Sequence, residues 1–146
     1  MRLHVISDGT GSPPIVFIHG LGSTAATWAL CMAQLRDRHH VLAIDLLGHG
    51  GSPVPDDPAE YTRDRALADI DEVLAGLTEP PVLVGHSLGG YLALAHAATR
   101  PGAARGIVVL NAGPGFRDPE KREGWNERSR RNAHRFGVPA QATELN

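Results

Sequence analysis

The 146-residue sequence lacks several features that would assign it to particular classes of protein. Its single cysteine, Cys31, excludes a disulfide within the chain, as is usual for proteins of a reducing compartment. A formal net charge of -2 gives no reason to expect nucleic acid or an anionic membrane as the main partner. No apolar run approaches the ~20 residues that cross a bilayer, and none follows a basic start as in a signal peptide. We therefore expect a cytoplasmic protein with neither nucleic acid nor a membrane as its partner.

Short apolar runs alternate with helical patterns up to residue 110, which is typical of parallel β/α units. With 42% hydrophobic residues the chain can bury a core, so we predict an α/β fold, a mostly parallel sheet with helices on both faces. Cys31 falls in the first expected helix, where we expect a buried, unreactive thiol. The patterns predict strands at residues 3–6, 15–18, 41–45, 82–84 and 106–110, and helices at residues 24–36, 63–77 (N-cap Thr62) and 88–99.

The composition changes after residue 113, so we divide the chain into a core, residues 1–113, and a second region, residues 114–146. Asp118-Pro119-Glu120 predicts a helix start, because it joins an N-cap, a proline at the first position and an acid in the first turn. Several arginines make this helix basic. A solvated helix face explains them better than nucleic-acid binding, because one charged helix in a near-neutral chain is weak support for the latter.

A glycine-flanked serine is the most informative motif in the sequence. Its pattern is G-x-S-x-G, with an apolar strand before it and a run of good helix formers after it. A serine on such a sharp turn is exposed at the carboxyl end of the sheet, next to the free N–H groups of the following helix. We therefore predict that Ser87 is a nucleophile, against the alternative of an ordinary strand–helix turn. The motif reads Gly85-His86-Ser87-Leu88-Gly89.

A second glycine-rich turn follows the strand at residues 15–18. A tetrahedral intermediate of acyl transfer needs two N–H donors for its negative oxygen. The backbone N–H of Leu88, directly after the nucleophile, is one candidate, and the backbone N–H of Leu21 is the other. The alternative for this turn is a purely structural role. The turn reads His19-Gly20-Leu21-Gly22.

These two motifs, together with residues 45–52 between them, resemble the α/β-hydrolase superfamily in their usual order. The resemblance covers about residues 1–115 and is specific to the superfamily and not to a substrate. It implies that Ser87 attacks a small-molecule ester or other acyl substrate, that Leu21 and Leu88 hold the oxyanion, and that no metal or organic cofactor is needed. It also implies that Asp45 and His49 shape the turn after the preceding strand.

The sequence departs from the family pattern at its C-terminal side. The family has a carboxylate after a later strand and a histidine near the C-terminus, whereas this chain ends after the strand that matches the sixth. We therefore expect a fragment or truncated product, with residues 114–146 as the start of a helical cap. In triad order the sequence offers Ser87, Asp118 and His134, but Asp118 is better explained as a helix cap.

Two alternatives to an ester hydrolase stay open. The same elbow and loop serve lactonases, C–C bond hydrolases, perhydrolases and acyltransferases. A non-catalytic remnant on this scaffold is the other alternative, since a serine without a base is a poor nucleophile. We expect little turnover and low stability from the 146-residue chain by itself. The sequence does not indicate an oligomeric state.

Overall fold

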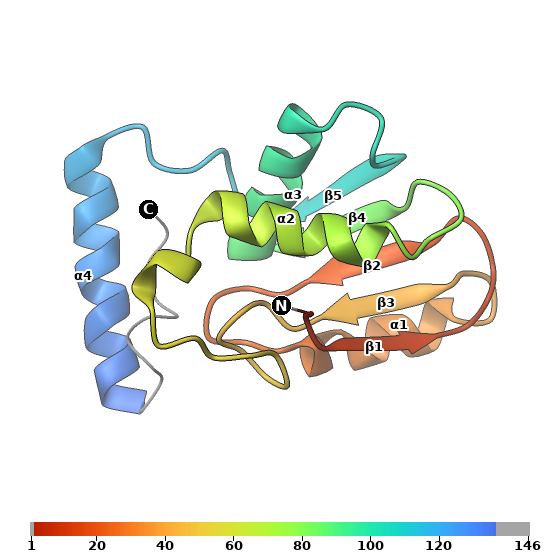
Figure 1. Cartoon of the computed structure of the whole chain (residues 1–146), viewed down its shortest axis with the longest axis horizontal. Helices are drawn as coiled ribbons and strands as arrows, with labels where there is room; N and C mark the ends of the chain where they lie inside the picture. The colour runs from red at the N-terminus through yellow and green to blue at the C-terminus, as the bar shows by residue number, and fades with distance from the viewer. Residues whose placement is uncertain (1, 137–146) are drawn as a thin grey trace.

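The computed structural model describes residues 2–136, with side chains described up to residue 131. Within this part the strands form one sheet in the order β1-β3-β2-β4-β5 (Figure 1). Strand β1 runs antiparallel to β3, and all other neighbours are parallel. This arrangement confirms the predicted α/β class with a mostly parallel sheet. The strands are β1 (Val5–Asp8), β2 (Ile15–Ile18), β3 (Val41–Ile44), β4 (Val82–His86) and β5 (Gly106–Leu110).

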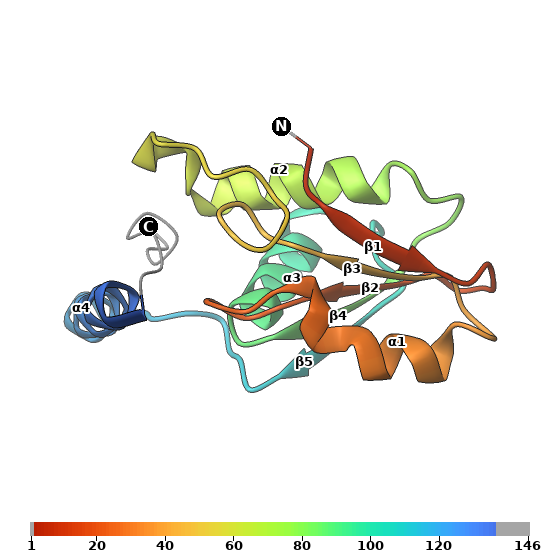
Figure 2. The ribbon, with the colours of Figure 1, turned by 90° about the horizontal axis from the view of Figure 1, so that it is seen from below.

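Helices cover the two faces of the sheet unequally. Figure 2 shows α2 (Arg63–Leu74) on one side and α1 (Ala29–Leu35) on the other. Helix α3 (Leu88–Thr99) packs with α2 against the first side. Since side chains alternate along a strand, Val16 and Ile18 enter the α2–α3 layer. Their neighbours Ile15 and Phe17 face the α1 layer, which contains Trp28 and Met32.

The first expected strand and the first expected helix differ from the structure in detail. The first strand lies two residues later than predicted, because its pairing with β3 begins at Val5. The predicted helix at residues 24–36 is a short 3-10 helix, η1 (Ala25–Trp28), followed by α1. The expectation that Cys31 is buried was wrong: its side chain is exposed, since α1 buries only Met32 against the sheet. The Thr62 cap is confirmed, because its hydroxyl accepts the N–H of Arg65 at 3.2 Å.

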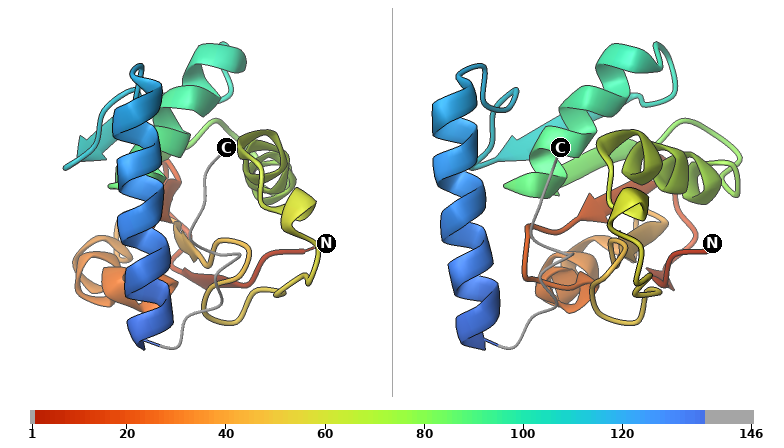
Figure 3. Two further views of the ribbon diagram at one scale, coloured as in Figure 1. Left: turned by 90° about the vertical axis from the view of Figure 1, so that its left-hand side faces the viewer. Right: turned by 60° about the vertical axis from the view of Figure 1, so that its left-hand side comes forward.

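The last described helix, α4 (Pro119–Phe136), stands beyond the carboxyl ends of the parallel strands (Figures 1 and 3). The Asp118 carboxylate accepts the N–H of Glu120 at 2.9 Å and the N–H of Lys121 at 3.4 Å, which confirms the predicted helix start. A short 3-10 helix, η2 (Pro58–Glu60), precedes α2. No helix in residues 2–136 is both long and apolar enough to cross a membrane.

Candidate active site

Ser87 occupies a sharp turn between β4 and α3, as the sequence predicts for a nucleophile elbow. Its backbone angles, φ 51° and ψ −114°, are sparsely populated by residues other than glycine. The backbone N–H of Ser87 donates to the carbonyl of Leu110 at 2.9 Å, and its carbonyl accepts the N–H of Tyr91 at 3.0 Å. A conformation of this kind costs about 1–3 kcal/mol, so the surrounding structure must hold it in place.

Close backbone approach brings the elbow against the end of β2. A Cβ atom on Gly89 would lie 2.1 Å from the carbonyl oxygen of Ile18, so no side chain fits at the start of α3. A Cβ atom on Gly20 would lie 3.2 Å from the Cβ of Ser87. The turn after β2 therefore packs directly on the serine, and we call residues 19–22 the glycine-rich loop.

Within residues 2–136, the backbone N–H groups of Leu21 and Leu88 donate to no backbone carbonyl. Leu88 is the first residue of α3, so its N–H has no acceptor within the helix. After Leu21 in the glycine-rich loop, the next two N–H groups have acceptors: Gly22 donates to His49, and Ser23 donates to the Gly20 carbonyl. Among residues 2–136, no hydrogen bond engages the N–H of Leu21. The two predicted donors thus lie on the residue after Ser87 and on the turn that packs against Ser87, and neither N–H has a hydrogen-bond partner among residues 2–136.

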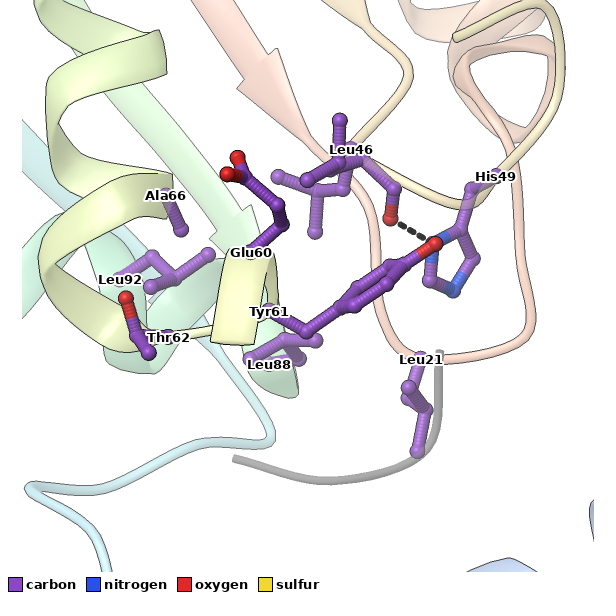
Figure 4. Close-up of a pocket in the computed structure, with 10 residues that line it drawn as sticks. Leu21, Leu46, His49, Glu60, Tyr61, Thr62, Ala66, Leu88 and Leu92 are labelled. Carbon is purple, nitrogen blue, oxygen red and sulfur yellow. Dashed lines mark hydrogen bonds between the residues drawn. The ribbon is translucent and has the colours of Figure 1, made fainter. Parts of the chain in front are cut away.

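A small, mostly apolar pocket of about 50 Å³ lies beside these two residues (Figure 4). The Tyr61 hydroxyl donates to the carbonyl of Pro55 at 2.9 Å, and burial raises the pKa of this phenol, which keeps it neutral. The Glu60 carboxylate pairs with Arg65 at 2.8 Å. The pocket thus offers an apolar interior with few polar groups. Its lining consists of Leu21, Leu46, Leu47, His49, Glu60, Tyr61, Thr62, Ala66, Leu88 and Leu92.

Two buried histidines, His19 and His49, form hydrogen bonds with the backbone of the glycine-rich loop. The Nδ1 atom of His19 lies 2.7 Å from the Gly20 carbonyl, and its Nε2 accepts the N–H of Leu46 at 3.0 Å. His49 has the same pattern: Nδ1 lies 3.0 Å from the Leu47 carbonyl, and Nε2 accepts the N–H of Gly22 at 3.1 Å. Burial lowers the pKa of both rings below the ordinary value of 6.5.

Asp45 fixes the turn that follows β3. Burial raises the pKa of its carboxyl, but hydrogen bonds outweigh this effect and place the pKa below its usual value. The donors are the N–H of Ala25 at 2.6 Å, the N–H of Gly51 at 2.9 Å and Nδ1 of His4 at 2.8 Å. The structural role expected for Asp45 is therefore confirmed, and His4 is an additional partner that the sequence analysis did not find.

A base for Ser87 is absent from the side chains described here, residues 2–131. Within them the Ser87 hydroxyl forms no hydrogen bond, and Nδ1 of His86 lies 3.0 Å from the position that a Cβ atom on Gly20 would occupy. Asp118 is exposed and caps α4, which supports the structural explanation for this carboxylate. His134, the other candidate, lies in α4 beyond the residues whose side chains are described. No group of three or more possible metal ligands occurs in the described region.

Comparison with known proteins agrees with this geometry. A sequence model of the alpha/beta hydrolase family matches residues 15–144. The chain belongs to the alpha/beta hydrolase family. Epoxide hydrolase 3 of Mus musculus is 32% identical over 116 residues, which are 78% of this chain and 32% of that protein. The pimeloyl-[acyl-carrier protein] methyl ester esterase of Xylella fastidiosa (strain M12) is 37% identical over 113 residues, 77% of this chain and 40% of the esterase.

A solved structure shows the same likeness in three dimensions. A crystal structure from work on carboxylesterases of the thaumarchaeon Nitrososphaera gargenis superposes with a TM-score of 0.78 at 26% identity. The match covers 90% of this alpha/beta hydrolase chain and 49% of the solved one. The chain thus spans about a third to two fifths of the two curated relatives and about half of the solved structure.

Proposed function

We propose that Ser87 is the nucleophile of a serine-type hydrolase that acts on an ester or another acyl substrate. The observation that carries this proposal is the positive-φ elbow at Ser87, with two N–H groups beside it, of Leu88 and Leu21, that have no hydrogen-bond partner among residues 2–136. Such an elbow aims the hydroxyl away from the sheet, toward the pocket side of α3. The Ser87 oxygen would attack the acyl carbon, and the N–H groups of Leu21 and Leu88 would stabilise the negative oxygen that develops.

The acyl-enzyme would then be released by water, and both steps use only groups of the protein and water. A base has to take the proton of Ser87 before attack and return it to the leaving group. We propose that this base is a histidine, and that the histidine and the carboxylate that orients it belong to a part of the protein outside residues 2–131. We also propose that residues 114–146 begin a helical cap over the site, since α4 stands beyond the strand ends (Figure 3).

A serine at the elbow favours acyl transfer over epoxide opening, although one relative is named an epoxide hydrolase. If the Ser87 oxygen opened an epoxide, the product would be an alkyl ether of serine. An ether has no carbonyl that water can attack and develops no oxyanion for Leu21 and Leu88 to bind. An ester of serine has both. The relative named a methyl ester esterase and the structure from carboxylesterase work support the same choice.

The apolar pocket indicates which part of the substrate lies next to the reacting carbon. Its leucine lining and small volume suit a short apolar acyl or alcohol group better than a charged one. The same elbow and loop also suit the alternative reactions of this scaffold. These are the reactions of lactonases, C–C bond hydrolases, perhydrolases and acyltransferases. A non-catalytic remnant is the second candidate function, and its support is the absence of a base for Ser87 in residues 2–131.

A substrate panel tests the proposal. The complete protein that contains the proposed base, and its Ser87→Ala variant, are assayed with p-nitrophenyl esters of increasing acyl length, with lactones and with a styrene-oxide-type epoxide. We expect ester turnover that falls with acyl length and disappears in the variant, and no epoxide turnover. Turnover that survives Ser87→Ala, or that is confined to the epoxide, would refute the proposed function. Absence of turnover for every substrate would favour the remnant.

A further inference from the structure

His19 and His49 hold the two peptide units on either side of the Leu21 α-carbon. One unit contains the Gly20 carbonyl and the Leu21 N–H, and Nδ1 of His19 lies 2.7 Å from that carbonyl oxygen. The next unit contains the Gly22 N–H, which donates to Nε2 of His49 at 3.1 Å. Since a peptide unit is planar and trans, a partner that fixes its carbonyl also fixes the direction of its N–H.

The protonation state of both rings follows from these contacts. A backbone N–H donates to Nε2 in each case, from Leu46 to His19 and from Gly22 to His49. Nε2 therefore carries no proton, and Nδ1 carries the one that is donated to a carbonyl, of Gly20 or of Leu47. The two rings are neutral and lie with centroids 5.0 Å apart. His19 is fully buried and His49 is 7% exposed, so water cannot replace these partners.

We propose that His19 and His49 are positioning residues for the oxyanion hole, and that only their neutral Nδ1–H forms aim the Leu21 N–H at the substrate oxygen. His19 draws the Gly20 carbonyl toward itself, so the Leu21 N–H on the same peptide unit points away from His19. The Ser23 N–H also donates to the Gly20 carbonyl, at 3.1 Å. Two donors on one carbonyl polarise the peptide unit and make its N–H a better donor. This inference rests on the proposed acyl chemistry at Ser87.

Charged neighbours decide how the two rings respond to acid. Burial disfavours a charged ring at both positions, and His49 adds to this effect at His19. Asp45, whose Oδ1 lies 4.0 Å from Nε2 of His19, favours a charged ring. Glu60 and Tyr61 line the same pocket as His49, and His86 lies across Gly20. The balance lowers both pKa values. A proton added to Nε2 would point at the backbone N–H that now donates to this atom. Acid would therefore break the hydrogen bonds from Leu46 to His19 and from Gly22 to His49, and residues 19–22 would no longer be held in place.

Nitrogen NMR of the imidazole rings tests the inference on the whole chain and needs no turnover. At neutral pH we expect His19 and His49 to show a protonated Nδ1 and an unprotonated Nε2. On acidification the Leu21 and Gly22 amide signals are expected to move together with the two rings. The inference would be overturned by an Nε2-protonated form of either ring at neutral pH. It would also be overturned if the Leu21 and Gly22 amide signals did not change while the two rings titrate.

A matched pair of variants separates positioning from general packing. His19→Asn keeps an amide donor near the Nδ1 position for the Gly20 carbonyl, whereas His19→Gln keeps only an acceptor near the Nε2 position for Leu46. His40→Gln, at the opposite end of β3, is the control. We expect the Leu21 amide signal to stay near its wild-type position in His19→Asn and in the control, and to move in His19→Gln. Equal shifts in Asn and Gln variants that both fold by circular dichroism would overturn the assignment.

The same variants give a chemical readout through a fluorophosphonate, which reacts with an activated serine. We expect His19→Gln to lower the labelling rate of Ser87 by about 10–100-fold, below the usual loss for removal of one oxyanion donor, and His19→Asn by a few-fold at most. Equal labelling rates would contradict the positioning role. If the wild-type chain is not labelled at all, the proposed function fails, and the amide signals of Leu21 still decide the positioning inference.

Discussion

The backbone N–H of Ser87 donates to the carbonyl of Leu110 at 2.9 Å, which ties the elbow to the end of β5. Leu110 is the last residue of that strand, and its register partner in β4 is His86, the residue before the serine. The chain then turns sharply at Asn111, whose φ of 51° lies in the left-handed region. The strained serine is therefore held by a strand that is followed directly by a second non-glycine residue of positive φ.

The turn at Asn111 gives a stability prediction. A β-branched side chain in this left-handed conformation costs about 1–2 kcal/mol, whereas glycine adopts it without strain. Asn111→Val should therefore lower the free energy of unfolding by about that amount, and Asn111→Gly should change it by a few tenths. Urea unfolding followed by circular dichroism measures both. Equal free energies of unfolding for the two variants would mean that residue 111 does not adopt the left-handed conformation.

The oxyanion role of Leu21 depends on its backbone and not on its side chain. Leu21→Ala keeps the N–H and should alter activity little, whereas Leu21→Pro removes the donor. Loss of one such donor lowers kcat by roughly 10²–10³-fold in a serine protease. Initial rates with a p-nitrophenyl ester, or labelling rates with a fluorophosphonate, compare the two variants after both are shown to be folded. Equal rates would remove Leu21 from the site.

The buried histidines make stability depend on pH in a defined direction. Their folded pKa values lie below 6.5, so below this pH the unfolded chain binds more protons than the folded chain. Their contribution is complete above about pH 6.5 and is lost as the pH falls from there through the lowered pKa values. Urea unfolding between neutral pH and about pH 5 should show this decrease. His49→Asn should make the free energy of unfolding fall less steeply with decreasing pH than it does in the His40→Gln control. An equal fall in the two variants would contradict the role given to His49.

The outer face of β5 leads us to expect self-association of this chain. Val108 and Leu110 lie on the α1 side of the sheet, where they are 44% and 42% exposed. An exposed apolar edge strand offers unpaired backbone groups to other chains. Size-exclusion chromatography over a concentration series should show association that a Val108→Lys change reduces. A wild-type chain that stays monomeric throughout the series would contradict this expectation.

The sequence was sufficient to predict the elements that depend on local pattern. A continuous apolar run identifies β2, since a strand covered on both faces needs no polar alternation. A similar run identifies β5, although one face of this strand is exposed in the structure. The elbow was predictable because its serine and glycines stand between a strand and a helix. The family assignment rests on these same motifs and is confirmed by the sequence model that matches residues 15–144.

The parts that sequence could not supply depend on contacts between distant segments. The start of β1 is set by pairing of Val5 with Ile44 across the sheet, and not by the apolar run that begins at Leu3. The exposure of Cys31 follows from which side of α1 meets the sheet. The histidine contacts could not be predicted either, because Leu46 and Gly22, the donors to His19 and His49, are each 27 residues away along the chain.

Labelling of Ser87 by a fluorophosphonate is the most direct measurement of the central claim, that this serine is an activated nucleophile. The intact 146-residue chain is incubated with the probe, and the modified residue is identified by peptide mass spectrometry, with Ser87→Ala as control. The account predicts one adduct on Ser87 that is absent from the variant, at a slow rate because no base for Ser87 lies among the side chains of residues 2–131. An adduct on another residue, or equal labelling of wild type and Ser87→Ala, would contradict it.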